Sequence, residues 1–518
     1  MSAPLVSLVT FLPLTGAVLL VFLRSGSDRA VRATALAVSL LTFALSLALF
    51  FGFDGGTGLA EFTERASWLG RGIDYHVGVD GISLFLVLLA TFLTPLALLS
   101  SWRAVDHRVR EFSFFMLMLE TGMIGVFVSL NLFLFYVFWE AMLVPMYFLI
   151  GIWGGRRRIY ATMKFVLFTM FGSLLMLVGI LALHAAYHAA TGAYSLTIAD
   201  LAAVPFSPAL QTWLFLAFGL AFAVKIPLFP LHTWLPDAHV EAPTAGSVLL
   251  AAVLLKMGAY GFLRLGLPLF PQAAATFAPG LSVLAVIGII YGGLMALVQK
   301  DMKSLVAYSS VSHMGLVCLA VFSLNFEAAE GALYQMLNHG LSTGALFLCV
   351  GMLYERTHTR TIADYGGAAA RMPVFAGFFL VTMLSSAGLP GLNGFVGEIL
   401  CFFGIFAANK TLAILSVATV VLSAAYLFGL YRRVMHGPLK DPNDGRLRDI
   451  DGRELACLIP IIVLIVYMGL FPGTFLRKMD AAVGRFIGTV APAQPAATAW
   501  AAPRDPDRAG PYPGVPER

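Results

Sequence analysis

Long apolar segments separated by short polar connections dominate the sequence. Segments such as 281–298 are apolar on every face, whereas a membrane β-strand would alternate polar and apolar side chains. A helix needs about 20 apolar residues to cross the hydrocarbon core of a bilayer. The pattern therefore predicts an all-α polytopic membrane protein with about fourteen transmembrane helices, centred near residues 13, 41, 90, 121, 142, 173, 220, 254, 290, 313, 342, 390, 423 and 465.

Composition agrees with this interpretation. Of the 518 residues, 59% are apolar and 12% are charged, whereas an average soluble domain has about 25% charged residues. Lipid is therefore the expected solvent for most of the chain. The net charge of +5 comes from basic loops, so it does not call for a nucleic-acid partner.

The distribution of Lys and Arg predicts the orientation in the membrane. Alternate loops, beginning with the loop after the first span, hold 20 of the 33 basic residues, and the opposite loops hold four. Basic loops stay on the cytoplasmic side. We therefore expect a multi-pass protein of the cell inner membrane with both termini on the periplasmic side.

Three lysines fall outside the loops and the C-terminal tail. Lys164 lies less than two helical turns after Arg158, so it can reach the membrane surface with its long side chain. Lys225 and Lys256 lie within or directly after apolar runs and belong at membrane depth. These two lysines are candidates for a functional site.

Three glutamates also lie within apolar helices, at Glu120, Glu140 and Glu398. Each charge at the centre of a membrane helix costs about 2.5 to 3.5 kcal/mol on insertion scales. Other interactions must offset this cost. One interpretation is that buried Lys–Glu pairs serve only to fix the packing of the helices. Ionisable groups inside membranes usually mark ion or proton pathways, so we expect a proton relay.

Two histidines lie on polar stripes of otherwise apolar helices. His313 follows Ser309 and Ser312, and His339 shares one helix face with Gln335, Ser342 and Thr343. An isolated buried histidine is often only a satisfied core residue, but imidazole also transfers protons at physiological pH. No second His or Cys lies three or four residues away, so the pattern does not indicate a metal site.

Helix-breaking residues accompany two of the buried charges. Prolines follow Lys225 at positions 227, 230 and 236, and Gly or Pro precedes Glu398 at positions 388, 390, 391 and 394. Proline can simply kink a helix. Broken backbone at membrane depth, however, requires protein or water to satisfy its polar groups, as in the ion sites of transporters. We therefore expect both breaks to belong to ion sites.

The predicted spans divide into two units of five helices. Since five is odd, the second unit enters the membrane from the opposite side, which gives an inverted repeat. Lys225 and Glu398 then occupy the fourth helix of their units. The predicted organisation is 1–111 (spans one to three), 112–265 (first repeat), 280–435 (second repeat), 436–480 (cytoplasmic loop and span fourteen) and 481–518 (a Pro/Ala-rich disordered tail).

Five segments resemble the antiporter-like subunits of respiratory complex I. The longest, residues 225–264, reads KIPLFPLHTWLPDAHVEAPTAGSVLLAAVLLKMGAYGFLR. The others read FYVFWEAMLVPMYFLIG, QKDMKSLVAYSSVSHMG, QMLNHGLSTGALFLCVG and GLPGLNGFVGEIL. The resemblance covers about residues 75–435 and implies a proton-translocating subunit of NADH:quinone oxidoreductase.

Within this family the sequence is most similar to the M-type chains. L-type and N-type chains carry Lys on the twelfth span, whereas M-type chains carry Glu, as this sequence does at Glu398. The resemblance implies a proton relay through Glu140, Lys225, Lys256 and Glu398. We hypothesise that Glu140 pairs with Lys225, that Lys256 connects this pair to the centre and that Glu398 is the exit group. The auxiliary positions that the resemblance implies are His313, His339 and Glu120.

The resemblance also implies the setting of the chain. NADH, FMN, iron–sulfur clusters and quinone are expected in other subunits, with L-type and N-type chains as membrane neighbours. The four cysteines form no Cys-x-x-Cys motif, and no Gly-x-Gly-x-x-Gly lies between a strand and a helix, so no redox centre is expected in this chain. A cation/proton antiporter subunit, an energy-converting hydrogenase subunit and a purely structural scaffold are the alternatives.

Overall fold

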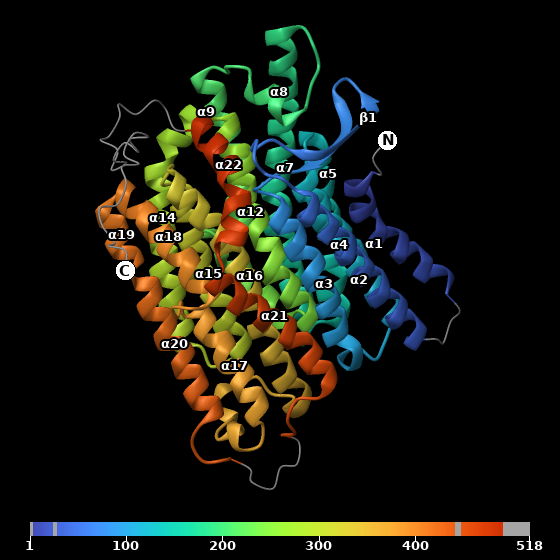
Figure 1. The fold of residues 1–518 in the computed structure, drawn as a ribbon, viewed down its shortest axis with the longest axis vertical. Helices are drawn as coiled ribbons and strands as arrows, with labels where there is room; N and C mark the ends of the chain where they lie inside the picture. Colours follow the sequence, from blue (N-terminus) through green and yellow to red (C-terminus); the bar gives the residue numbers. More distant parts are fainter. Residues whose placement is uncertain (1–3, 24–27, 441–446, 491–518) are drawn as a thin grey trace, which may run out of the picture.

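The computed structural model describes residues 4–23, 28–440 and 447–490, which form a bundle of long helices packed side by side (Figure 1). In these ranges thirteen helical spans are long and apolar enough to cross a membrane. Two shorter apolar helices, α17 (Pro373–Ser386) and α18 (Asn393–Ala408), lie where the sequence predicts the twelfth span. Together they account for the predicted total of about fourteen.

The spans of the N-terminal half are α1 (Leu5–Phe22), α2 (Asp28–Gly52), α3 (Leu84–Ala104), α4 (Val109–Val128), α5 (Leu132–Ala141) with α6 (Leu143–Trp153), α7 (Arg158–Thr191) and α9 (Pro208–Lys225). A continuous helical stretch follows: α11 (Thr244–Leu249), the π-helix η2 (Leu250–Leu254), α12 (Leu255–Gly261), the π-helix η3 (Phe262–Gly266) and α13 (Leu267–Leu269). The later spans are α14 (Pro271–Val298), α15 (Met302–Val321), α16 (Phe326–Thr357), α19 (Lys410–Ser416) with α20 (Ala418–Met435), and α21 (Gly452–Leu470).

Short elements join these spans. They are strands β1 (Glu61–Gly70) and β2 (Ile73–Val79), helices α8 (Ile198–Ala202) and α10 (Trp234–Glu241), and the 3₁₀ turns η1 (Leu231–Thr233), η4 (Ile362–Asp364) and η5 (Ala368–Ala370). Helix α22 (Gly473–Val490) follows the last span. The two strands pair as an antiparallel hairpin. The hairpin, α8 and α22 lie toward the same end of the bundle, at the top of Figure 1.

Contacts between loops fit the predicted alternation of sides. Isolated backbone pairs join Val77 to Ser129 and Asn131 to Thr197, which brings the connections after the second, fourth and sixth spans to one end. A separate pair joins Asp301 to Thr361, in the connections after the ninth and eleventh spans. The start of α1 lies beside β1, because the backbone N–H of Val6 donates to the Glu64 carboxylate at 2.8 Å.

Both predicted helix breaks are present. Helix α9 ends at Lys225, and the chain then turns through η1 before α10 begins. Helix α17 ends at Ser386 and α18 begins at Asn393, with Gly388 and Gly391 between them in the left-handed region (φ +76° and +90°). Glycine adopts this conformation without the steric cost that a side chain imposes.

Two central helices are buried along nearly their whole length. In the most apolar stretch of residues 244–269, 94% of the residues are buried, and in that of α16 all of them are buried. Other helices therefore separate them from lipid. Polar side chains on these helices must find partners inside the protein, because lipid offers none.

The C-terminal prediction was wrong at its boundary. Residues 481–490 do not belong to a disordered tail, since they complete helix α22. Met479, Ala482, Val483 and Phe486 are buried at helical spacing, which gives this helix an apolar face. The rest of the predicted tail, 491–518, lies outside the described residues.

Candidate functional site

Lys256 lies at the centre of the bundle. It is fully buried on α12, directly after the π-helix η2, and π-helical segments inside α-helices occur frequently at functional sites. Its Nζ lies 2.6 Å from the carbonyl oxygen of Ala251 and 2.7 Å from Nδ1 of His339 on α16. The lysine therefore joins the stretch 244–269 to the second predicted repeat.

A small polar cavity connects His339 to the second histidine. The ring centroids of His339 and His313 lie 5.8 Å apart. The cavity has a volume of about 10 Å³ and is lined by His313, Gln335, Asn338, His339, Ser342, Ser385, Ser386 and Gly394. This is close to the smallest space that holds one water molecule, and its polar lining offers the hydrogen-bond partners that such a water needs.

His313 leads from this cavity to Glu398. Its Nδ1 lies 3.4 Å from Oε1 of Glu398, and the side-chain amide of Gln335 donates to the same oxygen at 3.4 Å. On its other side, Nε2 of His313 lies 3.2 Å from the hydroxyl of Tyr426 on α20. Both His313 and Glu398 are buried. Lys256, His339, His313 and Glu398 thus form one line of ionisable side chains, which we call the relay line.

The break between α17 and α18 sets the position of Glu398. A Cβ on Gly388 would come within 2.5 Å of Oε2 of Glu398, so the carboxylate lies against the backbone of the break. Across the break, the hydroxyl of Ser385 donates to Oδ1 of Asn393 at 2.6 Å, while Ser342 of α16 lies 2.6 Å from Ser385. These bonds hold the start of α18 beside α16.

Lys225, at the end of α9, and Glu140, on α5, precede Lys256 in the sequence. Lys225 is buried, and its Nζ lies 5.3 Å from the ring centroid of Trp139 and 5.8 Å from that of Phe165. Within the described residues neither Lys225 Nζ nor Oε1 of Glu140 has a hydrogen-bond partner, although the two groups are near enough to act on each other electrostatically. The expected Glu140–Lys225 pair is therefore open, with the ammonium held over aromatic rings instead.

Glu120 makes no hydrogen bond to the relay line within the described residues. It is fully buried on α4, and neither carboxylate oxygen has a hydrogen-bond partner in the part of the chain that the structure describes. Burial without a partner disfavours the charged form of a carboxyl group. The structure therefore does not connect this predicted auxiliary residue to the other site residues.

His239 was missed from sequence alone. It is fully buried on α10 and stacks on Phe347, with ring centroids 4.7 Å apart and planes at 12°. Neither ring nitrogen has a partner among the described side chains and backbone groups. Lys256 and Lys303 are near enough to act on it electrostatically. The signal in the sequence that could have identified His239 as a candidate site residue is its position within the family-like segment 225–264.

Of two basic residues counted as loop residues, Lys303 proves to be buried and Arg264 largely buried. Nζ of Lys303, in the first turn of α15, donates to the carbonyl oxygen of Ala242 at 2.6 Å and to the hydroxyl of Ser247 at 3.2 Å. Arg264, on η3, forms a 2.6 Å ion pair with Asp80. Hydropathy places a residue within a span only to within a turn or two, so charges near span ends were assigned to loops.

Lys164 has an ion-pair partner near the first break. Its Nζ lies 2.7 Å from a carboxylate oxygen of Asp237 on α10. Both side chains remain partly exposed, at 21% and 29%.

Metal-ligating side chains do not gather in the described ranges, where no group of three or more His, Cys, Asp or Glu could hold a metal ion. Cys318, Cys349, Cys401 and Cys457 are buried free thiols. Buried ionisable groups do come together in the relay line. Amine, imidazole and carboxyl groups in this arrangement can accept and donate protons.

Comparison with protein families covers most of the chain. Residues 129–423 match the family model for NADH:quinone oxidoreductase/Mrp antiporter membrane subunits, and residues 8–127 match the amino terminus of NADH-ubiquinone oxidoreductase chain 4. The chain is 47% identical to NADH-quinone oxidoreductase subunit M of Rhodobacter capsulatus, over 93% of this chain and 96% of that protein.

Solved structures agree with the sequence relatives. A chain of respiratory complex I from Thermus thermophilus superposes with a TM-score of 0.86 at 35% identity, covering 94% of this chain and all of that one. A chain of the Mrp complex from a Dietzia species shares the fold, with a TM-score of 0.83 at 20% identity and coverage of 95% and 100%. The chain belongs to the family of NADH-quinone oxidoreductase subunit M, the antiporter-like membrane subunits of complex I.

Proposed function

We propose that this chain, as a membrane-arm subunit of NADH:quinone oxidoreductase, carries protons along the relay line from Lys256 through His339 and His313 to Glu398. The observation that carries this proposal is the continuity of the line. Lys256 and His339 lie within hydrogen-bond distance, at 2.7 Å. His313 and Glu398 lie within ion-pair distance, at 3.4 Å, without a hydrogen bond between them. A cavity that can hold one water separates the two histidines.

The chemistry of each group suits its place. An ammonium donates protons, an imidazole accepts a proton on one nitrogen and releases it from the other, and a carboxylate accepts one. A protonated Lys256 can pass its proton to Nδ1 of His339, after which a water in the cavity can carry it to His313. Glu398 then accepts the proton and becomes a neutral carboxylic acid. Only one group need carry the extra proton at a time, which limits the cost of charge inside the membrane.

Lys225 and Glu140 are proposed as a gate that loads the relay line. Burial disfavours the charged form of either group, whereas pairing favours the charged form of both. Closure of the pair would therefore keep Lys225 protonated, and opening, as observed here, would allow it to release its proton. The flexible stem of Lys225 permits such movement. Ser173 on α7 interacts with Glu140 in the open arrangement.

His239 and Lys303 are proposed to connect the line to the end of the bundle that carries the basic loops. Lys303 contacts the hydroxyl of Ser247, which in turn donates to the backbone carbonyl of His239 at 3.1 Å. His239 also lies near Lys256 and His339. Its unpartnered ring nitrogens leave it free to exchange a proton with a water or with either neighbour.

The wider setting is proposed from the basic loops and the family. The loop-rich basic end faces the cytoplasm and both termini face the periplasm of a cell inner membrane. Residues 112–265 and 280–435 form the two inverted five-helix units. NADH, FMN, iron–sulfur clusters and quinone are held by other subunits, and L-type and N-type chains flank this one. No observation favours an antiporter or hydrogenase complex instead.

The proposal is tested by Glu140→Gln in the assembled complex, reconstituted into proteoliposomes. Loss of the negative charge removes the partner that holds Lys225 protonated, so we expect proton translocation per complex to fall at least tenfold. Glu111→Gln, at the exposed start of α4, is the matched control and should leave the rate unchanged. Wild-type pumping and turnover in Glu140→Gln would refute the gate.

A further inference from the structure

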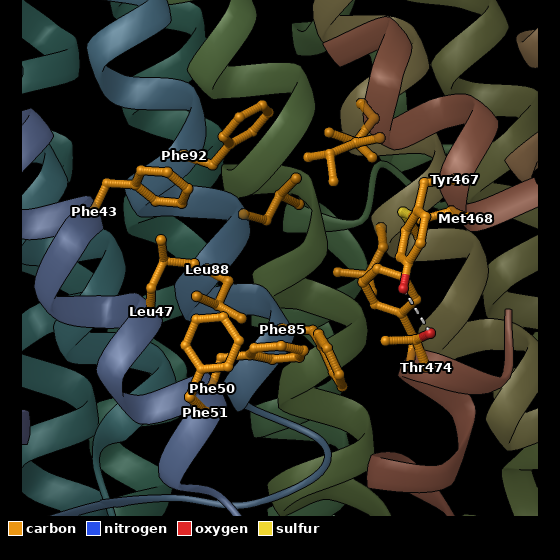
Figure 2. A pocket seen from close by; sticks show the side chains of 15 residues that line it. Phe43, Leu47, Phe50, Phe51, Phe85, Leu88, Phe92, Tyr467, Met468 and Thr474 are labelled. Carbon is orange, nitrogen blue, oxygen red and sulfur yellow. Dashed lines mark hydrogen bonds between the residues drawn. The ribbon is translucent and has the colours of Figure 1, made fainter. Parts of the chain in front are cut away.

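An apolar groove of about 350 Å³ opens on the flank of the bundle, away from the relay line. Helices α2 and α3 form one wall, α21 and the start of α22 form the other, and α16 forms the floor (Figure 2). The lining consists of Phe43, Leu47, Phe50, Phe51, Phe85, Leu88, Leu89, Phe92, Leu337, Leu341, Leu464, Tyr467, Met468, Thr474 and Phe475. Among these, the hydroxyls of Tyr467 and Thr474 bond each other at 3.0 Å.

The groove has the length of one membrane leaflet. Its α2 residues run from position 43 to position 51, a rise of about 12 Å at 1.5 Å per residue. Half of the hydrocarbon core measures about 15 Å. The groove lies where α2 and α21 end and α3 and α22 begin, so it extends inward from one membrane surface.

A positive charge stands at the outer end of the groove. Lys478 on α22 holds its Nζ 5.3 Å from the ring centroid of Phe50 and 5.7 Å from that of Phe53, and donates a hydrogen bond to the carbonyl oxygen of Phe53. One bond leaves two ammonium hydrogens for another acceptor. Arg477 is exposed beside it, while Asp480, the acid nearest in sequence, interacts with Glu330.

We propose that this groove binds an acyl chain of an anionic phospholipid, with the phosphate paired to the ammonium of Lys478. The aromatic and aliphatic lining suits a hydrocarbon chain, and the cation beside Phe50 suits a phosphate at the outer end of that chain.

The bound chain would pack against the helix that carries the relay line. Leu337 and Leu341 of the groove floor lie two residues before and after His339 on α16. Leu89 of the wall is so close to α16 that a Cβ on Gly340 would lie 2.6 Å from its side chain. The lipid thus fills space behind α16 that would otherwise leave the helix free to shift.

Photocrosslinking tests the site in the whole complex. The probe is phosphatidylglycerol with a diazirine at the end of one acyl chain, present in nanodiscs of phosphatidylcholine, and the labelled residues are mapped by mass spectrometry. We expect labelling of groove residues such as Leu88 and Met468 several-fold above that of Leu167 on α7, which is 54% exposed outside the groove. Equal labelling of both surfaces overturns the proposal, as does a partner helix found in the groove of the complex.

Charge variants test the headgroup contact. Lys478→Gln should reduce groove labelling by the phosphatidylglycerol probe about fivefold. Labelling by a phosphatidylcholine probe should fall less, because the choline cation offsets the charge of its phosphate. Lys410→Gln is the matched control, since Lys410 also lies near a phenylalanine ring (5.7 Å) but outside the groove. Equal labelling by phosphatidylglycerol in both variants overturns the role of Lys478.

A filling variant tests the groove itself. Leu47→Trp places a large side chain into the groove and should abolish labelling there, whereas Leu41→Trp on an exposed face of α2 should not. Retained labelling in Leu47→Trp overturns the proposal. Thermal stability of each complex, measured in the same nanodiscs, shows whether the variants remain assembled.

Discussion

Nζ of Lys256 lies 2.7 Å from Nδ1 of His339, deep in the bundle and 83 residues apart in sequence. The contact joins the last helical stretch of the first predicted repeat to the third helix of the second. Because neither side chain reaches water directly, a proton exchanged between them stays inside the protein. This pair is therefore the point at which the two halves of the chain can share one proton pathway.

Tyr426 is expected to position His313. Its hydroxyl lies 3.2 Å from Nε2 of His313, and a hydrogen bond of this kind contributes about 0.5 to 1.5 kcal/mol. Tyr426→Phe should therefore slow proton translocation by about two- to tenfold in proteoliposomes. Tyr334→Phe is the control, since it removes a buried hydroxyl that donates to the backbone carbonyl oxygen of Met468, far from His313 in sequence. An equal loss in both variants would remove the positioning role.

Gly388→Ala is expected to displace Glu398. The new methyl group would approach Oε2 of Glu398 to 2.5 Å and also strain the backbone at φ +76°. Gly391→Ala brings a similar strain at φ +90° but meets no atom within 4 Å in the described structure. We expect proton translocation to fall at least tenfold in Gly388→Ala and less than about threefold in Gly391→Ala. The same loss in both would show that backbone strain alone is responsible.

The Arg264–Asp80 pair is expected to stabilise the subunit. Both side chains are largely buried, at 15% and 5% exposure, and loss of one partner from a buried pair costs about 3 to 5 kcal/mol. Arg264→Gln should lower the thermal midpoint of the purified complex. Arg65→Gln breaks an exposed pair with Asp74 and should cost less than about 1 kcal/mol. A small effect at Arg264 would contradict this account of its burial.

The membrane fold could be predicted because lipid imposes a simple rule on sequence. Apolar runs of sufficient length gave the spans, and the breaks beside Lys225 and Glu398 followed from Pro and Gly. The hairpin β1–β2 and helix α22 were missed because they lie outside the apolar spans that the pattern detects. Helix α22 shows its apolar face only at helical spacing, in a segment with charged residues.

The candidate site could be predicted only in part. Hydropathy identified Lys256 and Glu398 because a charge in an apolar run is conspicuous, but it could not show which groups touch. His239 and Lys303 lie in or beside short polar segments that look like loops, and tertiary packing buries them. The open gap between Glu140 and Lys225 is a matter of side-chain conformation, which sequence does not encode directly.

The most direct test of the relay line is the rate of proton translocation per complex in proteoliposomes that carry Lys256→Met or Lys256→Arg. Methionine removes the charge, whereas arginine keeps a cation and hydrogen-bond donors but does not release a proton. Lys300→Arg, at an exposed loop position, is the control. We predict that the rate of proton translocation falls at least tenfold in both Lys256 variants. Wild-type translocation in an assembled Lys256→Arg complex would contradict the account, since it would show that Lys256 supplies only a fixed charge.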